Sequence, residues 1–173
     1  NYKAPFSPID VIEEYTRPAR MMINGKLITK PALSEIEILN FNNDIELEAF
    51  NTDGLRSLLQ TMSHVNNMSE KTLRFPGHAK LIKEYIKKDI LQDEETIEYL
   101  FNEWKLEKDE PEFTILKVKI ETDEKTISYE LFDEFDKTSK TSSMARTTGF
   151  TATATINLIL EGLFDEKGVF PPE

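Results

Sequence analysis

Apolar and polar residues alternate along several stretches of the chain, and this period of two predicts β-strands with one buried face. The alternation is longest, and richest in Ile, Phe, Tyr and Val, over 113–120 and 126–135. Two short strands are predicted on either side of Asn24-Gly25, a pair that tolerates the positive φ angles of a tight hairpin. The predicted strands occupy 19–30 (as that hairpin), 35–41, 45–50, 70–75, 113–120 and 126–135.

Apolar residues spaced three and four apart predict amphipathic helices between and around these strands. The first helix is expected to begin with Ser7 as its cap and Pro8 at its first helical position. Asp53 is expected to cap the second helix, and Gly162 is expected to end the last one. The predicted helices occupy 7–15, 54–62, 78–90, 94–104 and 144–163.

This order of elements predicts an α+β fold. Consecutive strands joined by tight turns, such as the polar turn at 42–44, favour antiparallel pairing. We therefore expect a mixed, largely antiparallel sheet of about six or seven strands with helices packed on one face. A chain of 173 residues is long enough for one domain with its own core, so 1–173 is expected to form a single domain.

Charge and composition narrow the classes of partner. The formal net charge of −11 repels phosphate backbones and anionic lipids, so we expect neither nucleic-acid nor membrane binding. No apolar run approaches the roughly 20 residues that a membrane span needs. The chain has no cysteine, which excludes disulfides and thiolate metal sites and fits a reducing compartment. We therefore expect a cytoplasmic protein.

Few segments have the spacing of a known type of site. None of the six glycines stands in a GxGxxG or Walker arrangement, so no nucleotide cofactor is expected to bind this chain by the usual route. His64 and His78 are the only histidines, and they lie too far apart for common metal-ligand spacings, so no metal site is expected.

The strand that ends at Pro76-Gly77 leads directly into a helix, and ligands collect at such junctions. Arg74 lies near the end of this strand, and its planar guanidinium group matches a carboxylate. Pairing with one of the chain's own acids is the alternative for Arg74. His78 falls in the first turn of the helix, as a candidate general base or as a structural residue.

Five segments occur in an order that resembles the C-terminal domain of the saccharopine dehydrogenase family, including its lysine 6-dehydrogenase-like members. The similarity covers nearly the whole chain, and no single segment decides it. The segments are 2–8, 51–56, 70–78, 143–150 and 168–173.

The resemblance implies an upstream Rossmann domain, absent from this chain, that binds NAD or NADP. It implies that this chain contributes substrate contacts and forms a homodimer through a broad sheet, and that the helix at 143–163 packs toward the Rossmann domain. The chemistry implied is hydride transfer at a carbon that carries an amine. On this reading the chain is a substrate-binding and dimerisation domain, inactive alone. The alternative is a non-catalytic dimerisation or interaction module derived from the same family.

The resemblance also implies roles for individual residues. Thr72, Leu73 and Arg74 look like the stretch that contacts the amino-acid end of the substrate, with Arg74 as the carboxylate clamp. Asn51, Thr52 and Asp53 align with a site where saccharopine-reducing members have Asn-Arg-Asp-Ser. Thr52 replaces that arginine, which favours lysine, with its single carboxylate, over saccharopine.

Overall fold

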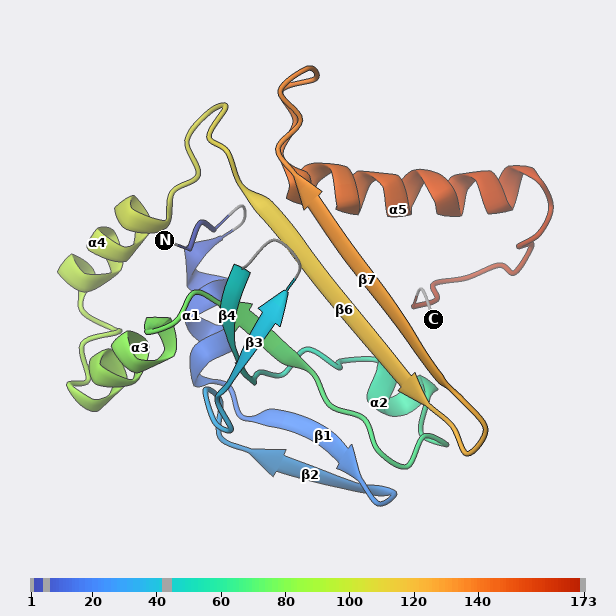
Figure 1. The fold of residues 1–173 in the computed structure, drawn as a ribbon, viewed down its shortest axis with the longest axis horizontal. Helices are drawn as coiled ribbons and strands as arrows, with labels where there is room; N and C mark the ends of the chain where they lie inside the picture. Colours follow the sequence, from blue (N-terminus) through green and yellow to red (C-terminus); the bar gives the residue numbers. More distant parts are fainter. Residues whose placement is uncertain (1, 5–6, 42–44, 172–173) are drawn as a thin grey trace. The chain divides into compact units, whose positions relative to one another are not determined.

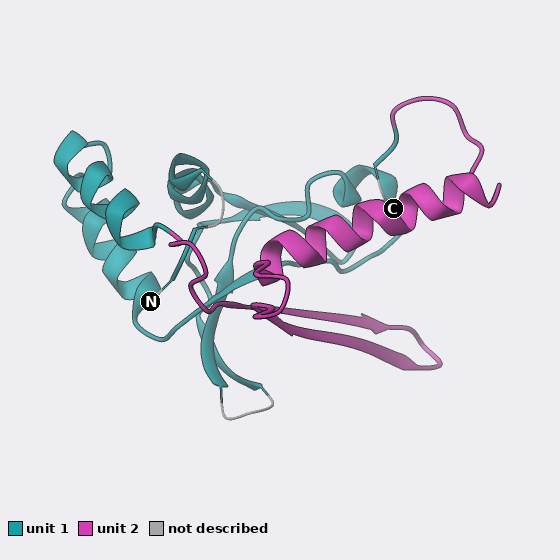
Figure 2. Cartoon of the chain, turned by 90° about the horizontal axis from the view of Figure 1, so that it is seen from above, with its two compact units in different colours: residues 1–105, 170–173 teal, residues 106–169 magenta. Residues whose placement is uncertain are grey.

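The computed structural model describes residues 2–4, 7–41 and 45–171, so the predicted turn at 42–44 lies outside the described residues. The chain divides into two compact units (Figure 2). Unit 1 consists of Asn1–Lys105 with Phe170–Glu173, and unit 2 consists of Leu106–Val169. That residues 1–173 act as one domain stays a prediction beside this division.

The described residues form five helices and seven strands (Figure 1), which confirms the α+β class. All the strand pairs are antiparallel, as expected, but they form three small sheets, β1–β2, β3–β4–β5 and β6–β7, where one sheet was predicted. In the described residues every strand pairs only with strands next to it in sequence, and β4 has a strand on each side. The elements are α1 (Pro8–Thr16), β1 (Ala19–Ile23), β2 (Lys26–Lys30), β3 (Glu37–Phe41), β4 (Ile45–Asn51), α2 (Leu58–Thr61), β5 (Lys71–Arg74), α3 (His78–Lys87), α4 (Glu94–Trp104), β6 (Phe113–Glu121), β7 (Thr126–Glu134) and α5 (Ser143–Leu160).

Local sequence explains several of these boundaries. Asn24 and Gly25 have φ angles of 50° and 71°, the left-handed values that a two-residue hairpin turn between β1 and β2 requires. Pro8 is the first residue of α1, although the Ser7 side chain forms no capping hydrogen bond. The prediction for the second helix is wrong in two respects, because α2 has only four residues and Asp53 does not cap it. Asp53 instead binds Arg20, 33 residues away in sequence.

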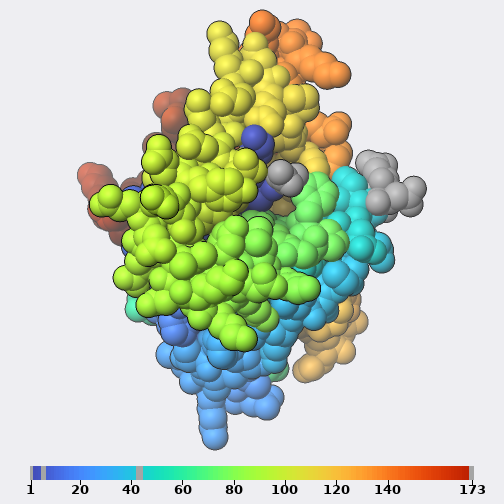
Figure 3. Space-filling view, turned by 90° about the vertical axis from the view of Figure 1, so that its left-hand side faces the viewer, coloured from blue at the N-terminus to red at the C-terminus, as the bar shows by residue number. Residues whose placement is uncertain are grey.

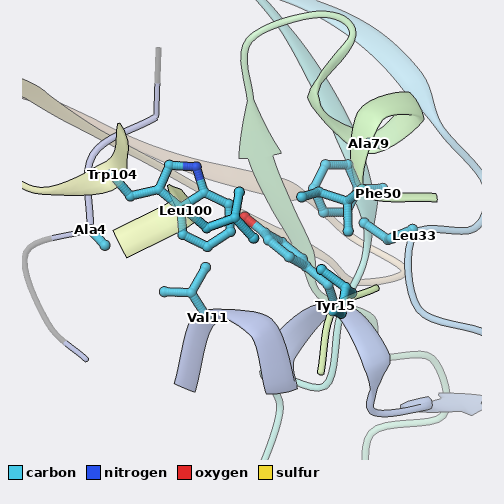
Figure 4. Packing of buried hydrophobic residues seen from close by; sticks show 10 residues of the cluster. Ala4, Val11, Tyr15, Leu33, Phe50, Ala79, Leu100 and Trp104 are labelled. Carbon is cyan, nitrogen blue, oxygen red and sulfur yellow. The ribbon is translucent and has the colours of Figure 1, made fainter. Parts of the chain in front are cut away.

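The core of unit 1 brings together α1, α3, α4 and β4 (Figure 4). The Tyr15 ring lies edge-to-face against the rings of Phe50 and Trp104, with centroids 6.1 and 6.2 Å apart. Such edge-to-face pairs add to the free energy gained by burying the rings. The remaining buried apolar members of this cluster are Ala4, Val11, Leu33, Ala79, Ile82, Leu91 and Leu100.

Unit 2 is a long hairpin, β6–β7, followed by the helix α5, whose cap Ser142 accepts a hydrogen bond from the Ala145 amide. The register of the hairpin places most apolar residues of both strands on one face, while Phe113, Ile115 and Phe132 lie on the other. Large parts of these side chains are exposed, and α5 also exposes apolar residues. We call the following residues the hairpin face: Leu116, Val118, Ile120, Ile127, Tyr129 and Leu131. None of the helices in the described residues is both long and apolar enough to cross a bilayer.

Candidate functional site

The candidate site lies at the junction of β5 and α3, whose strand end and helix start fall where the sequence predicted them. Gly77 makes the turn with a φ angle of 95°, which a side chain would disfavour. Glu48, which is buried, accepts hydrogen bonds from the amides of Gly77 and Ala79. The N-terminus of α3 is therefore neutralised by the chain's own carboxylate, which removes it as a binding site for a ligand anion.

Arg74 is the central cation of this junction, with a side chain that is only 14% exposed. Its Nε donates to the Tyr15 hydroxyl at 2.9 Å, and its Nη1 donates to the Leu73 carbonyl at 2.8 Å. Its guanidinium carbon lies 4.0 Å from the centre of the Tyr2 ring, a cation–π contact. The nearest carboxylate is that of Glu14, 3.8 Å from Nη2 and beyond hydrogen-bonding distance.

His78 is linked to Arg74 through Tyr15, whose oxygen lies 2.9 Å from His78 Nε2. The Tyr15 oxygen accepts a hydrogen bond from Arg74 Nε, and the donor in its contact with His78 Nε2 depends on the imidazole tautomer. Burial, and then the nearby Arg74 charge, lowers the His78 pKa to about 4, and burial raises the Tyr15 pKa above its ordinary value. A neutral imidazole is the state that a general base needs, and the role of His78 as that base stays a prediction.

Thr52 and Thr72 belong to a chain of four oxygen atoms beside Arg74. Glu70 Oε2 lies 2.7 Å from the Thr52 hydroxyl, the two hydroxyls lie 2.7 Å apart, and Glu14 Oε1 lies 2.6 Å from the Thr72 hydroxyl. Oxygens at these distances need a proton between them. Two hydroxyl protons cannot serve three contacts, so one carboxyl must supply the third proton.

Glu70 is the better holder of that proton, since Glu14 is the carboxylate that faces Arg74. Burial raises the Glu70 pKa, although hydrogen bonds from Thr52 and the Gly54 amide oppose the shift. A Cβ at position 54 would lie 2.5 Å from Glu70 Cδ, so a larger residue there would displace the Glu70 carboxyl. Burial therefore shifts the Glu70 carboxyl toward its protonated form.

Three other predicted site residues have different surroundings. The Asn51 side chain donates to Ser34 Oγ and Glu35 Oε2, both at 2.9 Å, and is almost fully buried. Asp53 accepts two hydrogen bonds from the Arg20 guanidinium, at 2.9 and 2.8 Å, and the side-chain bond from Arg20 lowers the Asp53 pKa. Leu73 meets Arg74 through its carbonyl. The structure thus brings Thr52, Thr72, Arg74 and His78 into one neighbourhood and leaves Asn51 and Asp53 in separate pairs.

The predicted residues are surrounded by groups that the sequence analysis missed. These come from α1, from the N-terminal segment, from the middle of β4 and from the residue before β5, so no local spacing connects them. The sequence offers only its large number of acidic residues as an indication, and this number does not point to particular positions. The missed residues are Tyr2, Glu14, Tyr15, Glu48 and Glu70.

Neither metal nor nucleotide ligands gather near this junction. The described residues contain no group of three or more His, Asp or Glu side chains arranged to hold a metal ion. The sequence has no glycine-rich loop of the kind that binds a pyrophosphate. The groups present at the junction are side chains that could bind a small polar molecule.

Comparisons with known proteins identify the family. A family model described as the saccharopine dehydrogenase C-terminal domain matches residues 1–173. The fold is similar to that of apo histidine-tagged saccharopine dehydrogenase (L-Glu forming) from Saccharomyces cerevisiae, with a TM-score of 0.71 at 15% identity. That match covers 98% of this chain and 56% of the yeast chain, so this chain spans little more than half the length of that relative. The chain therefore belongs to the saccharopine dehydrogenase C-terminal domain family, a family of oxidoreductase domains.

Proposed function

We propose that this chain is the substrate-binding and dimerisation part of a nicotinamide-dependent oxidoreductase. The reaction is oxidation or reduction at the CH–NH or CH–NH2 group of lysine or of a saccharopine-like amino acid. NAD or NADP, held by a Rossmann domain outside these 173 residues, would supply the hydride chemistry. The residues of this chain bind and orient the amino acid, and Arg74 holds its carboxylate.

The contrast between two arginines carries this proposal. Arg20 presents its guanidinium group to Asp53 and forms a bidentate pair, so its capacity for a carboxylate is used. Arg74 is more deeply buried, at 14% against 43% exposed, yet none of the carboxylates in the described residues lies within hydrogen-bonding distance of it. A buried guanidinium group with unused donors is a receptor for a carboxylate from outside the chain.

Unit 2 supports the dimerisation part of the proposal. The hairpin face exposes Leu116, Ile120 and Tyr129 at 55%, 45% and 61%. A two-stranded ribbon is marginally stable in water, and an apolar face this large normally marks an interaction surface. A second copy of the chain is the simplest occupant, because isologous dimers are the commonest oligomers.

The hairpin face also favours a second candidate function, a non-catalytic dimerisation module. Such a module needs unit 2 but has no need for a buried Arg74 that lacks a bidentate carboxylate partner. Measuring the enzymatic activity of an Arg74 variant therefore separates the two candidates.

The test is steady-state kinetics of the full-length enzyme with Arg74→Ala. Removing one partner of a desolvated charge pair costs about 2–5 kcal/mol. This corresponds to a loss in kcat/KM of roughly 30- to 3,000-fold. Arg74→Lys should recover part of this loss, since an ammonium group cannot form the bidentate pair. Arg17→Ala is the matched control, because Arg17 binds Glu13 on the surface of α1. If Arg74→Ala stays within about threefold of wild type, the non-catalytic module becomes the better description.

A further inference from the structure

Arg74 and Glu14 form a pair of opposite charges that are close together but not hydrogen-bonded to each other. Arg74 Nη2 and Glu14 Oε2 lie 3.8 Å apart, and the two side chains are 14% and 26% exposed. The chain holds the other atoms of both groups in place. Arg74 Nε donates to the Tyr15 hydroxyl, and Arg74 Nη1 donates to the Leu73 carbonyl. Glu14 Oε1 accepts a hydrogen bond from the Thr72 hydroxyl at 2.6 Å.

The remaining atoms of the pair, Arg74 Nη2 and Glu14 Oε2, are in reach of solvent. In the described part of the chain, the buried side-chain atoms without a hydrogen-bond partner are Asp133 Oδ2 and Arg146 Nε, and neither atom of the pair is among them. Helices α3 and α4 cover much of unit 1 on the face shown in Figure 3. Within the described residues, neither helix contributes a hydrogen bond or an ion pair to Arg74 or Glu14. A ligand can therefore meet Nη2 and Oε2 together.

The charges of this pair select a class of ligand. A simple carboxylate would be attracted by Arg74 and repelled by Glu14, and a simple cation would experience the reverse. A carboxylate and an ammonium group side by side satisfy both residues. In an α-amino acid, the ammonium nitrogen and the nearer carboxylate oxygen lie about 2.7 Å apart, as standard bond lengths require. With hydrogen bonds of about 2.9 Å to the protein, these two ligand atoms can span the 3.8 Å between Nη2 and Oε2.

We propose that Glu14 binds the α-ammonium group of the substrate, beside the carboxylate held by Arg74. The inference rests on the proposed function, because Arg74 must hold the carboxylate for Glu14 to reach the neighbouring nitrogen. It narrows the substrate to compounds with a free α-amino acid end. Des-amino acids, α-keto acids and N-acylated amino acids present a carboxylate but no cation to this pair, so the site should discriminate against them.

The test compares L-lysine with 6-aminohexanoate, which lacks only the α-ammonium group. Isothermal titration calorimetry of the full-length enzyme measures the dissociation constant of each ligand. Wild type is expected to bind L-lysine roughly 10- to 100-fold more tightly, the range for a hydrogen bond between charged groups. Glu14→Gln keeps an acceptor for the Thr72 hydroxyl and removes the charge. The preference should then fall to about threefold or less, because L-lysine alone loses affinity.

A purely structural role for Glu14 predicts a different result. If Glu14 were only the counter-ion of Arg74, Glu14→Gln would tighten the binding of both ligands and leave the preference unchanged. Glu13→Gln is the matched control, since Glu13 is the preceding acid on α1 and binds Arg17 on the surface. This control should leave the preference for L-lysine as it is in wild type.

Arg74→Ala separates a failure of this inference from a failure of the proposed function. The variant should weaken the binding of both ligands, and unchanged binding of both would refute the proposed function and this inference with it. Where Arg74→Ala does weaken both, equal affinities in wild type, an undiminished preference in Glu14→Gln or equal effects of Glu13→Gln and Glu14→Gln would overturn the role of Glu14 alone. Wild type that binds no L-lysine would also overturn this role.

Discussion

Glu70 provides the sharpest test of the electrostatics beside Arg74. Glu70 Oε2 contacts both the Thr52 hydroxyl and the Gly54 amide, so in the Glu70→Gln variant the amide oxygen takes this position and accepts from both groups. Glutamine stays uncharged at every pH, as a protonated carboxyl does. Wild type and variant should have the same free energy of unfolding in acid and should diverge as the pH rises.

The sign and size of this divergence follow from the raised pKa of Glu70. A carboxyl whose pKa is raised by folding stabilises the protein below its unfolded pKa and loses that stabilisation as pH rises through the folded pKa. The wild-type free energy of unfolding should fall relative to the variant with a slope of at most about 1.4 kcal/mol per pH unit. Glu70 is half-buried, so solvent screening should keep the total on the order of 1 kcal/mol.

Urea unfolding followed by Trp104 fluorescence, repeated from acid to neutral pH, measures this difference in unit 1. Glu35→Gln is the control of opposite sign, since hydrogen bonds from Asn51 and Lys30 lower the Glu35 pKa. Glu35→Gln should therefore lower the free energy of unfolding more at neutral pH than in acid. A difference between wild type and Glu70→Gln that stays flat with pH would refute a raised pKa for Glu70.

Three further outcomes are expected. Glu48→Ala should lower the free energy of unfolding by about 2–3 kcal/mol in urea titrations, because the buried amides of α3 lose their acceptor. In NMR titrations His78 should take up its proton only near pH 4, because burial and the Arg74 charge disfavour the imidazolium, so stability should fall as pH drops from about 6.5 toward that value. A midpoint near 6.5 would contradict the burial of His78 beside Arg74. Light scattering should give a dimer for wild type and for Lys119→Asp, but a monomer for Val118→Asp, since the two side chains lie on opposite faces of the hairpin.

Local patterns predicted most of the elements, because turns, caps and alternation act over a few residues. The Asn24-Gly25 hairpin and the strand that ends before Pro76-Gly77 are confirmed for this reason. Contacts between distant segments were out of reach. Asp53 was expected to cap the second helix because aspartate is a common cap residue. In the structure its carboxylate instead binds Arg20 at 2.8 Å, a partner that only folding brings close.

The same limit applies to the site. The alternation over 45–50 predicts a solvent-facing Glu48, but the amides of α3, about 30 residues later, draw its carboxylate into the interior. Arg74 was identified by its place at a strand end. What makes it a candidate receptor, the lack of a bidentate carboxylate, is a property of its three-dimensional surroundings.

The exposed hairpin face has a consequence for the lifetime of the protein. If order in this ribbon depends on a second copy, the thermal stability of unit 2 is set by mass action and rises with protein concentration. Each tenfold dilution then removes about 1.4 kcal/mol from the assembled state. Newly made chains at low abundance would spend more time with an open ribbon, the state that proteases and aggregation act on. The abundance of the protein then helps to determine how long each copy survives.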